Sequence, residues 1–463
     1  MSYSPQLSYF LDRLSGFSTN IFKLQCQGSD SAKANNIIRI TLPANSLVNF
    51  RSFALHFDAA ITSAGAEGRL PNKIDSLIER VEVAFGGVQV SAGNNMYNVL
   101  RHAKDALMGD STDPILGHPE VVRAESYHKA SGIGTDSNVS TTYKKEVKAP
   151  YVIDKWEGFL GTVEPKIVDL SLLPECVVSI YLAENAVCID ASGTNLFGNA
   201  TTPITAAASA PAPVYELTNI YATIETIGLA DGTYDSMISQ MISQVGYLEL
   251  PFKQYISFQD TTANNMRFSV ATQSLDRLWL VHRDTDFNTA GGAVLVSGHK
   301  VSGAFVDDAT GETDADIDIG VPQFDTLDYN KEKYVSKYFN FPEPAGGVSK
   351  HQLQLNGALF PQYQASVEDM FQLSKQSVLG GKHQMKYGLR TMRDNYSVFC
   401  VRLNLCDSEF SRNLTGLDTR SIALNGFYNM YGVTSSGAKG VNIFAEVSSS
   451  LRIGPSMQIE VLQ

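Results

Sequence analysis

Short stretches in which apolar and polar side chains alternate recur along the whole 463-residue chain. In the segment 53–60, Phe53, Leu55 and Phe57 occupy alternate positions, while His56 and Asp58 fall between them. Because successive side chains of a strand point to opposite faces, this spacing predicts a half-buried strand. Similar patterns predict strands at 36–42, 215–227 and 442–462, two strands within 170–189, and their counterpart at 396–405.

Two predicted hairpins are each followed by a predicted helix. Gly86-Gly87 separates apolar strands within 78–90, and Asn356-Gly357 separates strands at 352–355 and 358–363. Such dipeptides between apolar runs are a strong hairpin signal because both residues tolerate positive φ. Apolar residues at helical spacing then predict helices at 95–108 and 366–377, and a bridging helix at 234–245.

The two halves of the chain repeat each other. Arg39-Ile-Thr-Leu-Pro-Ala-Asn-Ser-Leu47 and Arg267-Phe-Ser-Val-Ala-Thr-Gln-Ser-Leu275 share one pattern of residue types, and each runs into an apolar strand that carries a histidine, His56 or His282. Asn219-Ile-Tyr-Ala222 recurs as Asn442-Ile-Phe-Ala445 at nearly the same offset. A period this long indicates a duplicated domain, because solenoid and propeller repeats run to only about 20–50 residues.

The predicted fold is therefore all-β, with a few short helices. Each half has about eight short strands with long connections, which is typical of an eight-stranded antiparallel jelly roll, and two tandem copies make a double jelly roll. The predicted divisions are an N-terminal arm at 1–34, a first roll at 35–230, a bridging helix and linker at 231–250, and a second roll at 251–463 with a long insertion near 284–347.

The arm carries an amphipathic pattern. Leu7, Phe10, Leu11 and Leu14 follow the three-four spacing of one helical face. A helix this short is not stable alone in water, so the apolar face needs a surface to lie on. Two interpretations are possible: the arm packs on its own domain, or it reaches a neighbouring subunit or an underlying layer. If the second interpretation is correct, deletion of residues 1–17 impairs assembly more than folding.

The net charge indicates which binding partners to expect, and the cysteine content indicates the redox compartment in which the chain folds. The net charge is −12 and no Lys/Arg block stands out, which weighs against direct, sequence-specific binding to nucleic acid. The five cysteines show no Cys-x-x-Cys spacing, and neither a signal peptide nor an apolar run long enough to span a membrane is visible. We therefore expect folding inside a reducing cell.

Candidate chemistry is sparse. No phosphate-binding Gly-rich loop, nucleophile elbow or His-Glu-x-x-His motif is present, so we expect neither an enzyme nor a cofactor. Asp314, Asp316 and Asp318 have the alternating spacing of a calcium loop and are weak metal candidates, but the following glycine is one place late, which favours a solvated acidic loop. Trp156, Trp279 and Tyr181 suit either sugar stacking or, more commonly at strand positions, a core.

Three segments resemble one protein family. They are Leu70-Pro-Asn-Lys-Ile-Asp-Ser-Leu-Ile-Glu-Arg-Val-Glu-Val83 leading to Gly86-Gly87, then Gln352-Leu-Gln-Leu-Asn-Gly-Ala-Leu-Phe-Pro361, and the joint from 215 to 253. With these segments in this order, the chain resembles the double jelly-roll major capsid proteins of double-stranded DNA viruses. Within that family it most resembles the polinton-like virus and virophage group.

The resemblance implies a homotrimer that forms a pseudo-hexameric capsomer and tiles an icosahedral shell in the virion. The implied partners are neighbouring capsomers, penton and minor capsid proteins and, as an open alternative, an internal membrane. The helices after the hairpins would lie at tile borders, and the loops at 109–149, 191–213 and 284–347 would project outward or clamp neighbours. The alternative function is a carbohydrate-binding β-sandwich, such as a lectin-like attachment protein.

Overall fold

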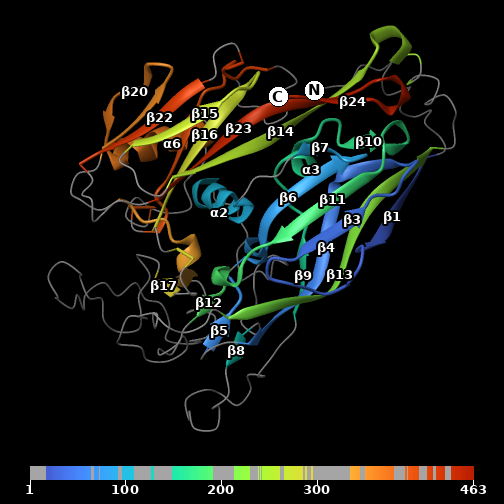
Figure 1. Cartoon of the computed structure of the whole chain (residues 1–463), viewed down its shortest axis with the longest axis horizontal. Helices are drawn as coiled ribbons and strands as arrows, with labels where there is room; N and C mark the ends of the chain where they lie inside the picture. The colour runs from blue at the N-terminus through green and yellow to red at the C-terminus, as the bar shows by residue number, and fades with distance from the viewer. Residues whose placement is uncertain are drawn as a thin grey trace, which may run out of the picture.

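The computed structural model shows two β-barrels that follow one another along the chain, with helix α2 between them (Figure 1). The structure describes residues 17–63, 67–71, 73–91, 96–108, 127–129, 149–190, 213–229, 238, 240, 242–260, 265–284, 287–288, 293–295, 334–344, 350–379, 392–393, 395–405, 414–420, 424–432 and 440–463. None of the helices in these ranges is long and apolar enough to cross a membrane.

The first barrel consists of two antiparallel sheets and a small accessory sheet. One sheet has the order β1-β13-β4-β10, with β2 added to β13 and β9 added to β4, and the other has the order β3-β11-β6-β7. The strands are β1 (Phe17–Gln25), β2 (Ala32–Lys33), β3 (Ile37–Thr41), β4 (Leu47–Ser63), β6 (Ile78–Phe85), β7 (Val88–Ser91), β9 (Ala149–Ile153), β10 (Ile167–Asp169), β11 (Cys176–Leu182) and β13 (Val214–Leu229). The accessory sheet contains β5 (Glu67–Arg69), β8 (Tyr127–Lys129) and β12 (Ile189–Asp190).

The second barrel repeats this arrangement. Its sheets have the orders β14-β23-β16-β21, with β24 added to β23, and β15-β22-β19-β20. The strands are β14 (Leu248–Asp260), β15 (Asn265–Val270), β16 (Leu275–Arg283), β19 (Lys350–Leu355), β20 (Ala358–Ala365), β21 (Val398–Arg402), β22 (Leu424–Tyr431), β23 (Gly440–Ile453) and β24 (Ile459–Leu462). At the base of the long insertion, β17 (Ala293–Leu295) pairs with β18 (Tyr334–Ser336).

The matching strand orders confirm the predicted duplication. Both copies of the nine-residue repeat begin in equivalent edge strands, since Arg39 lies in β3 and Arg267 in β15. The four-residue echoes lie in the equivalent strands β13 and β23. The segment 396–405 was predicted to be the counterpart of the strands within 170–189, and this prediction is wrong. In the second barrel β22 takes the place that β11 has in the first, whereas β21, which lies within 396–405, is the edge strand beside β16.

The local predictions of turns and helices are confirmed. Gly86 and Gly87 adopt φ of 55° and 86°, and Asn356 and Gly357 adopt 48° and 88°, as tight hairpin turns require. The helices are α2 (Tyr97–Met108) and α6 (Val367–Leu379), with a short α3 (Phe159–Thr162) in the first barrel. The described residues of the predicted bridging helix, 238, 240 and 242–245, are helical.

The predicted arm contains a strand of the barrel. Residues Phe17–Gln25 form β1, which pairs along its whole length with β13. This pairing satisfies backbone groups that β13 would otherwise leave open at its edge, and Leu24 packs against the core. The amphipathic pattern at Leu7, Phe10, Leu11 and Leu14 lies outside the described residues.

Two hydrophobic clusters stabilise the molecule. The smaller cluster fills the second barrel, between the inner faces of its sheets. The larger cluster fills the first barrel and continues onto the outer face of the second barrel, where it includes Tyr255, Trp279 and Phe444. The two barrels therefore share one apolar core across their boundary.

Candidate functional site: the seam between the barrels

Helix α2 is buried between the two barrels. Its residues Val99, Leu100, Ala103 and Leu107 belong to the shared core, and no residue from 97 to 107 is exposed. The helix contacts α6 and β21 of the second barrel. For α2, the expectation of a place at a tile border is wrong, because this helix is buried between the two barrels of its own chain.

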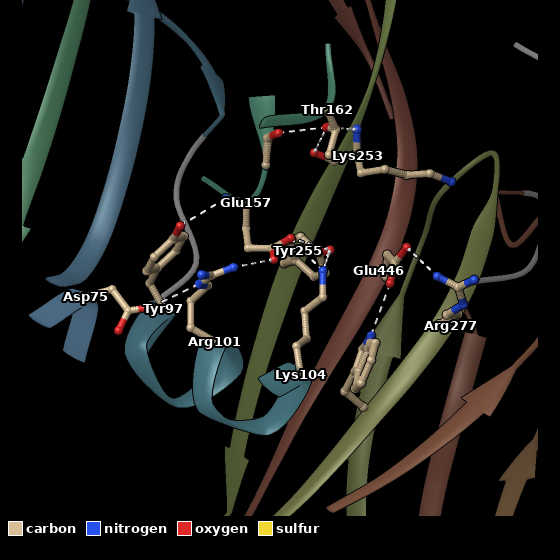
Figure 2. Close-up of polar contacts among 12 residues, drawn as sticks. Asp75, Tyr97, Arg101, Lys104, Glu157, Thr162, Lys253, Tyr255, Arg277 and Glu446 are labelled. Carbon is tan, nitrogen blue, oxygen red and sulfur yellow. Dashed lines mark hydrogen bonds and ion pairs between the residues drawn. The ribbon is translucent and has the colours of Figure 1, made fainter. Parts of the chain in front are cut away.

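A buried carboxylate, Glu157, joins the two barrels through α2 (Figure 2). Its Oε1 accepts a hydrogen bond from Arg101 Nη1 at 3.2 Å, and its Oε2 accepts from Lys104 Nζ at 2.6 Å and from the Tyr255 hydroxyl at 3.1 Å. Lys104 Nζ also donates to the Tyr255 hydroxyl at 3.1 Å, and Arg101 Nε donates to Asp75 at 3.2 Å. Tyr255 lies on β14, so these five residues form a polar network, the seam network, that crosses the boundary.

Within the seam network, Glu157 stays ionised and Tyr255 stays protonated although both are buried. Burial alone would raise the pKa of Glu157, but Lys104 and Arg101 outweigh it, so the pKa lies below its usual value. Burial and the nearby Glu157 carboxylate raise the pKa of Tyr255 well above its usual value, and the hydroxyl stays a donor. The Glu157 backbone N–H also donates to the Tyr97 hydroxyl at 2.9 Å. A buried ion pair with nearly every hydrogen-bonding position occupied fixes geometry even where it adds little net stability.

Backbone hydrogen bonds reinforce the same boundary. The Lys253 N–H on β14 donates to the Thr162 hydroxyl at 2.8 Å, and that hydroxyl donates to the Gly158 carbonyl at 2.7 Å (Figure 2). The Glu164 N–H donates to the Pro251 carbonyl at 2.9 Å. Strand β14 is thus bound to the turn around α3, and the two barrels cannot slide past each other without breaking these bonds.

Aromatic rings fill the space beside these bonds. Phe159 on α3 meets Phe252 of the second barrel edge-on, with ring centroids 5.1 Å apart. On its other side it meets Phe50 at 5.3 Å and Phe85 at 5.8 Å. Edge-to-face contacts of this kind add to the free energy gained by burying apolar area.

Charged side chains also cross-link the strands that the first barrel covers. The Lys253 ammonium on β14 pairs with Asp276 on β16 and donates to the Ser448 hydroxyl on β23 at 2.7 Å. On the same sheet, Glu446 accepts from Arg277 at 3.4 Å and from the Trp279 indole N–H at 3.1 Å. These contacts connect three neighbouring strands and make the covered sheet face rigid.

A second cross-barrel contact surrounds Arg283 of β16. Its guanidinium lies 3.5 Å from the Phe287 ring centroid and 4.5 Å from that of Tyr338, and it donates to the Tyr338 carbonyl at 3.3 Å. The Tyr338 hydroxyl donates to Glu79 of the first barrel at 3.4 Å. Burial raises the pKa of Glu79, although the Met96 N–H and Arg283 oppose this.

Inside the second barrel, two histidines share one hydroxyl. His282 Nδ1 lies 3.0 Å from the Ser397 carbonyl, which can only accept, so this nitrogen carries the proton. His282 Nε2 then accepts from the Tyr428 hydroxyl at 2.9 Å, and that oxygen accepts from His351 Nδ1 at 2.8 Å. This hydrogen-bond chain requires His282 to be neutral, because its Nε2 accepts. Burial lowers the pKa of His282 to about 4, and burial together with the neighbouring His282 lowers that of His351 to about 3.

Comparison with solved structures gives matches over nearly the whole chain. PBCV-1 VP54, fitted into a reconstruction of the virophage Sputnik, matches with a TM-score of 0.55 at 13% identity over 96% of this chain and 97% of its own. The PBCV-1 virus capsid gives 0.53 at 12% identity over 96% and 97%, and the Faustovirus major capsid protein gives 0.53 at 9% identity over 95% and 91%.

The chain has the double jelly-roll fold. The resemblance noted in the sequence is confirmed at the level of the fold, because these neighbours are double jelly-roll capsid proteins. No protein-family model matches the sequence, and no curated protein matches it.

The residues singled out from the sequence fall in different places of the double jelly roll. Asp314, Asp316 and Asp318 lie outside the described residues. Within the ranges that the structure describes, no group of three or more His, Cys, Asp or Glu side chains is placed to hold a metal ion. Trp156 and Trp279 are buried, as the core interpretation predicted, whereas Tyr181 on β11 is half-buried and its hydroxyl donates to Glu82 at 2.9 Å.

Sequence reasoning identified neither the seam network nor the other buried charges at the boundary between the barrels. One signal was available, because charged residues interrupt apolar strands at Lys253, Arg283 and Glu446, where a strand covered on both faces should be continuously apolar. A charge at such a position needs a buried partner. The partners themselves lie too far away in the sequence for spacing to indicate them.

Proposed function

We propose that this double jelly-roll chain is the major capsid protein of a double-stranded DNA virus, located in the capsid of the virion. Three copies form a closed trimer whose six similar barrels give a pseudo-hexagonal tile, and tiles pack into an icosahedral shell. The observation that supports this most strongly is the match of both barrels, over 95–96% of the chain, to proteins of assembled capsids. The role is structural, without catalysis.

The seam supports this role on physical grounds. A tile transmits force between its neighbours only if its two barrels move as one body. Glu157, Lys104 and Tyr255 connect the barrels in the interior. At a second point Tyr338, which Arg283 contacts, donates to Glu79 of the first barrel. These buried contacts are what a rigid building block requires, and neighbouring capsomers, penton proteins and minor capsid proteins would be its partners.

The alternative, a carbohydrate-binding protein, gains no support from the two tryptophans among the aromatic residues that suggested it. The chain has two tryptophans, and Trp156 and Trp279 are 6% and 1% exposed. Trp156 donates its indole N–H to the Phe53 carbonyl at 2.8 Å, and Trp279 donates to Glu446. Rings held inside a core in this way do not present a face on which a sugar can stack.

The test is the solution state of the purified full-length chain. Size-exclusion chromatography with light scattering should give a stable trimer, and electron microscopy should show particles with a six-sided outline. A chain that stays monomeric at every concentration tested, and forms no particles, would contradict the proposal.

A further inference from the structure

Four buried polar residues connect the two sheets of the second barrel through its interior. His282 lies on β16 and Ser397 directly precedes β21, both at the sheet β14-β23-β16-β21, whereas His351 and Tyr428 lie on β19 and β22 of the opposite sheet. Hydrogen bonds join them in the order Ser397, His282, Tyr428, His351. These four residues form the histidine network. It lies where β16 ends and β19 begins, at the end of the barrel that meets the long insertion.

The duplication shows what the same fold places at these positions in the first barrel. The hairpin turns align β19 with β6, and the cross-strand pairs then align β22 with β11. On this alignment His351 corresponds to Val81, and Tyr428 corresponds to Val178. Both valines are buried in the core of the first barrel.

The position of His282 is also apolar in the first barrel. The repeated Asn-Ile-aromatic-Ala stretch aligns β23 with β13, and the pairing of these strands with β16 and β4 then places His282 at Ala59, which is buried. His56, which the sequence repeat suggested as the counterpart of His282, corresponds to Trp279 instead. The first barrel therefore closes at this end with apolar side chains alone.

The histidine network is costly as well as dispensable to the fold. A buried polar group destabilises a protein unless every hydrogen-bonding position is occupied. The Tyr428 hydroxyl gives its proton to His282, so His351 must donate to it through Nδ1, and Nε2 of His351 keeps a lone pair. That Nε2 is buried and has no hydrogen-bond partner among the residues that the structure describes. It is a free site for an incoming proton.

No carboxylate contacts the two imidazoles among the described residues. Their rings face each other with centroids 5.6 Å apart, and the β21 side chain that packs against both is Phe399. The titratable group between them is the hydroxyl of Tyr428. The carboxylate whose charge acts on Tyr428 is Glu343, and it already pairs with Arg393 at 3.0 Å. A proton gained by either imidazole is therefore not compensated.

We infer that the histidine network is an acid-sensitive contact, and that its protonation separates the two sheets at this end of the second barrel while the first barrel stays closed. A proton on His351 Nε2 creates a buried N–H without an acceptor in the described structure, and a proton on His282 Nε2 removes the acceptor of the Tyr428 hydroxyl. Two protons place like charges side by side in an apolar interior. The opening is local because the apolar cluster that fills the rest of the barrel does not titrate.

The direction of the pH dependence follows from the two states. Burial lowers the pKa of both imidazoles in the closed barrel, whereas in the open, hydrated state each returns to about 6.5. Below pH 6.5 the open state binds more protons, so acid favours opening. Between pH 7 and pH 5 the equilibrium constant for opening should rise about twentyfold for one imidazole and several hundredfold for both. The effect is a property of one chain and does not depend on the proposed assembly.

The experiment is hydrogen exchange of the full-length chain at pH 7 and pH 5, read by mass spectrometry and corrected for the intrinsic pH dependence of amide exchange. Peptides that cover the end of β16 and the start of β19 report on the histidine network. Peptides around Ala59 on β4 and Val81 on β6 are the internal control, because they cover the equivalent positions of the first barrel. At pH 5 the corrected exchange should rise at least about twentyfold in the first group and change less than about threefold in the control.

Variants assign the effect to the network. His351→Phe should reduce the rise to that of one imidazole. The triple variant His282→Leu/His351→Phe/Tyr428→Phe makes this end apolar, as in the first barrel, and should abolish the rise. The Ser397 carbonyl still accepts the backbone N–H of residue 282 at 3.3 Å in that variant. His56→Phe, on the outer face of the first barrel, is the matched control and should leave the rise unchanged.

Two results would overturn the inference. One is a corrected exchange that rises equally in both barrels, which would indicate global unfolding by acid. The other is a rise that keeps its full size in His351→Phe, a variant that decides the matter even where the triple variant does not fold.

Discussion

The Tyr255 hydroxyl of the second barrel donates to the Glu157 carboxylate of the first barrel at 3.1 Å. This bond lies at the centre of a network in which Lys104 contacts both residues. It connects residues that belong to separate copies of the duplicated unit. Duplication alone gives two similar barrels, whereas contacts of this kind hold the two barrels together as one rigid unit.

The first prediction concerns the charge at the centre of the network. Glu157→Ala leaves Lys104 and Arg101 in a buried site without their shared carboxylate. Breaking a buried pair in this way costs about 3–5 kcal/mol, because an uncompensated charge remains. Urea denaturation followed by tryptophan fluorescence should show this loss in the free energy of unfolding. The control, Glu460→Ala at an exposed position of β24, should change it by less than about 0.5 kcal/mol; equal effects of the two variants would refute the structural role of Glu157.

The second prediction concerns cooperativity between the barrels. Arg283→Met removes the guanidinium between Phe287 and Tyr338 while keeping an apolar stem of similar length. The second barrel has its own inner core, so weakening the seam should separate the unfolding of the barrels. Calorimetry should show one transition for the wild type and a broadened or double transition for the variant. A single, equally sharp transition in both proteins would show that Arg283 does not couple the barrels.

Local features of the fold were predictable because their causes are local. Gly86-Gly87 and Asn356-Gly357 form hairpin turns because these residues accept positive φ, and the alternation at Phe53, Leu55 and Phe57 buries one side of β4. The order of such elements, repeated once, was enough to predict a double jelly roll.

The seam was not predictable, because its geometry depends on contacts between distant residues. Lys104 and Tyr255 are 151 residues apart in sequence, and Glu157 and Tyr255 are 98 apart. No periodic pattern relates such positions. The strand β1 was missed for a related reason, because its pairing with β13 requires the end of the first barrel to return to its beginning.

The third prediction compares two glycines that are needed for different reasons. Gly426 lies on β22, and a Cβ there would be 2.2 Å from the Phe268 ring, so Gly426→Ala overpacks the second barrel and should cost about 1–3 kcal/mol. Gly357 has φ of +88° with open space around its Cβ position, so Gly357→Ala should cost only about 1 kcal/mol of backbone strain. Thermal unfolding should rank the two variants in this order, and the reverse order would show that the core around Phe268 relaxes freely.

The fourth prediction concerns acid. The pKa of His282 is lowered to about 4 and that of His351 to about 3, so both imidazoles are neutral in the folded barrel at pH 6, while in the unfolded chain they gain protons below about pH 6.5. The unfolded state then binds more protons, and stability falls as pH falls. Each histidine should cost about 1.4 kcal/mol per pH unit once the pH is well below 6.5. The loss should be visible in urea midpoints measured between pH 6.5 and 5, above the range in which ordinary carboxylates titrate.

The variant His351→Phe separates this effect from other titrations. It fills the same space and removes one of the two imidazoles, although it leaves the Tyr428 oxygen without the donor that His351 Nδ1 provides. Its stability at pH 7 should therefore be lower than that of the wild type, but its fall between pH 6.5 and 5 should be about half as steep. His56→Phe serves as the comparison, because burial lowers the pKa of His56 less and this histidine lies on the outer face of the first barrel. If His351→Phe and the wild type lose stability equally over this interval, the paired histidines are not the source of the acid sensitivity.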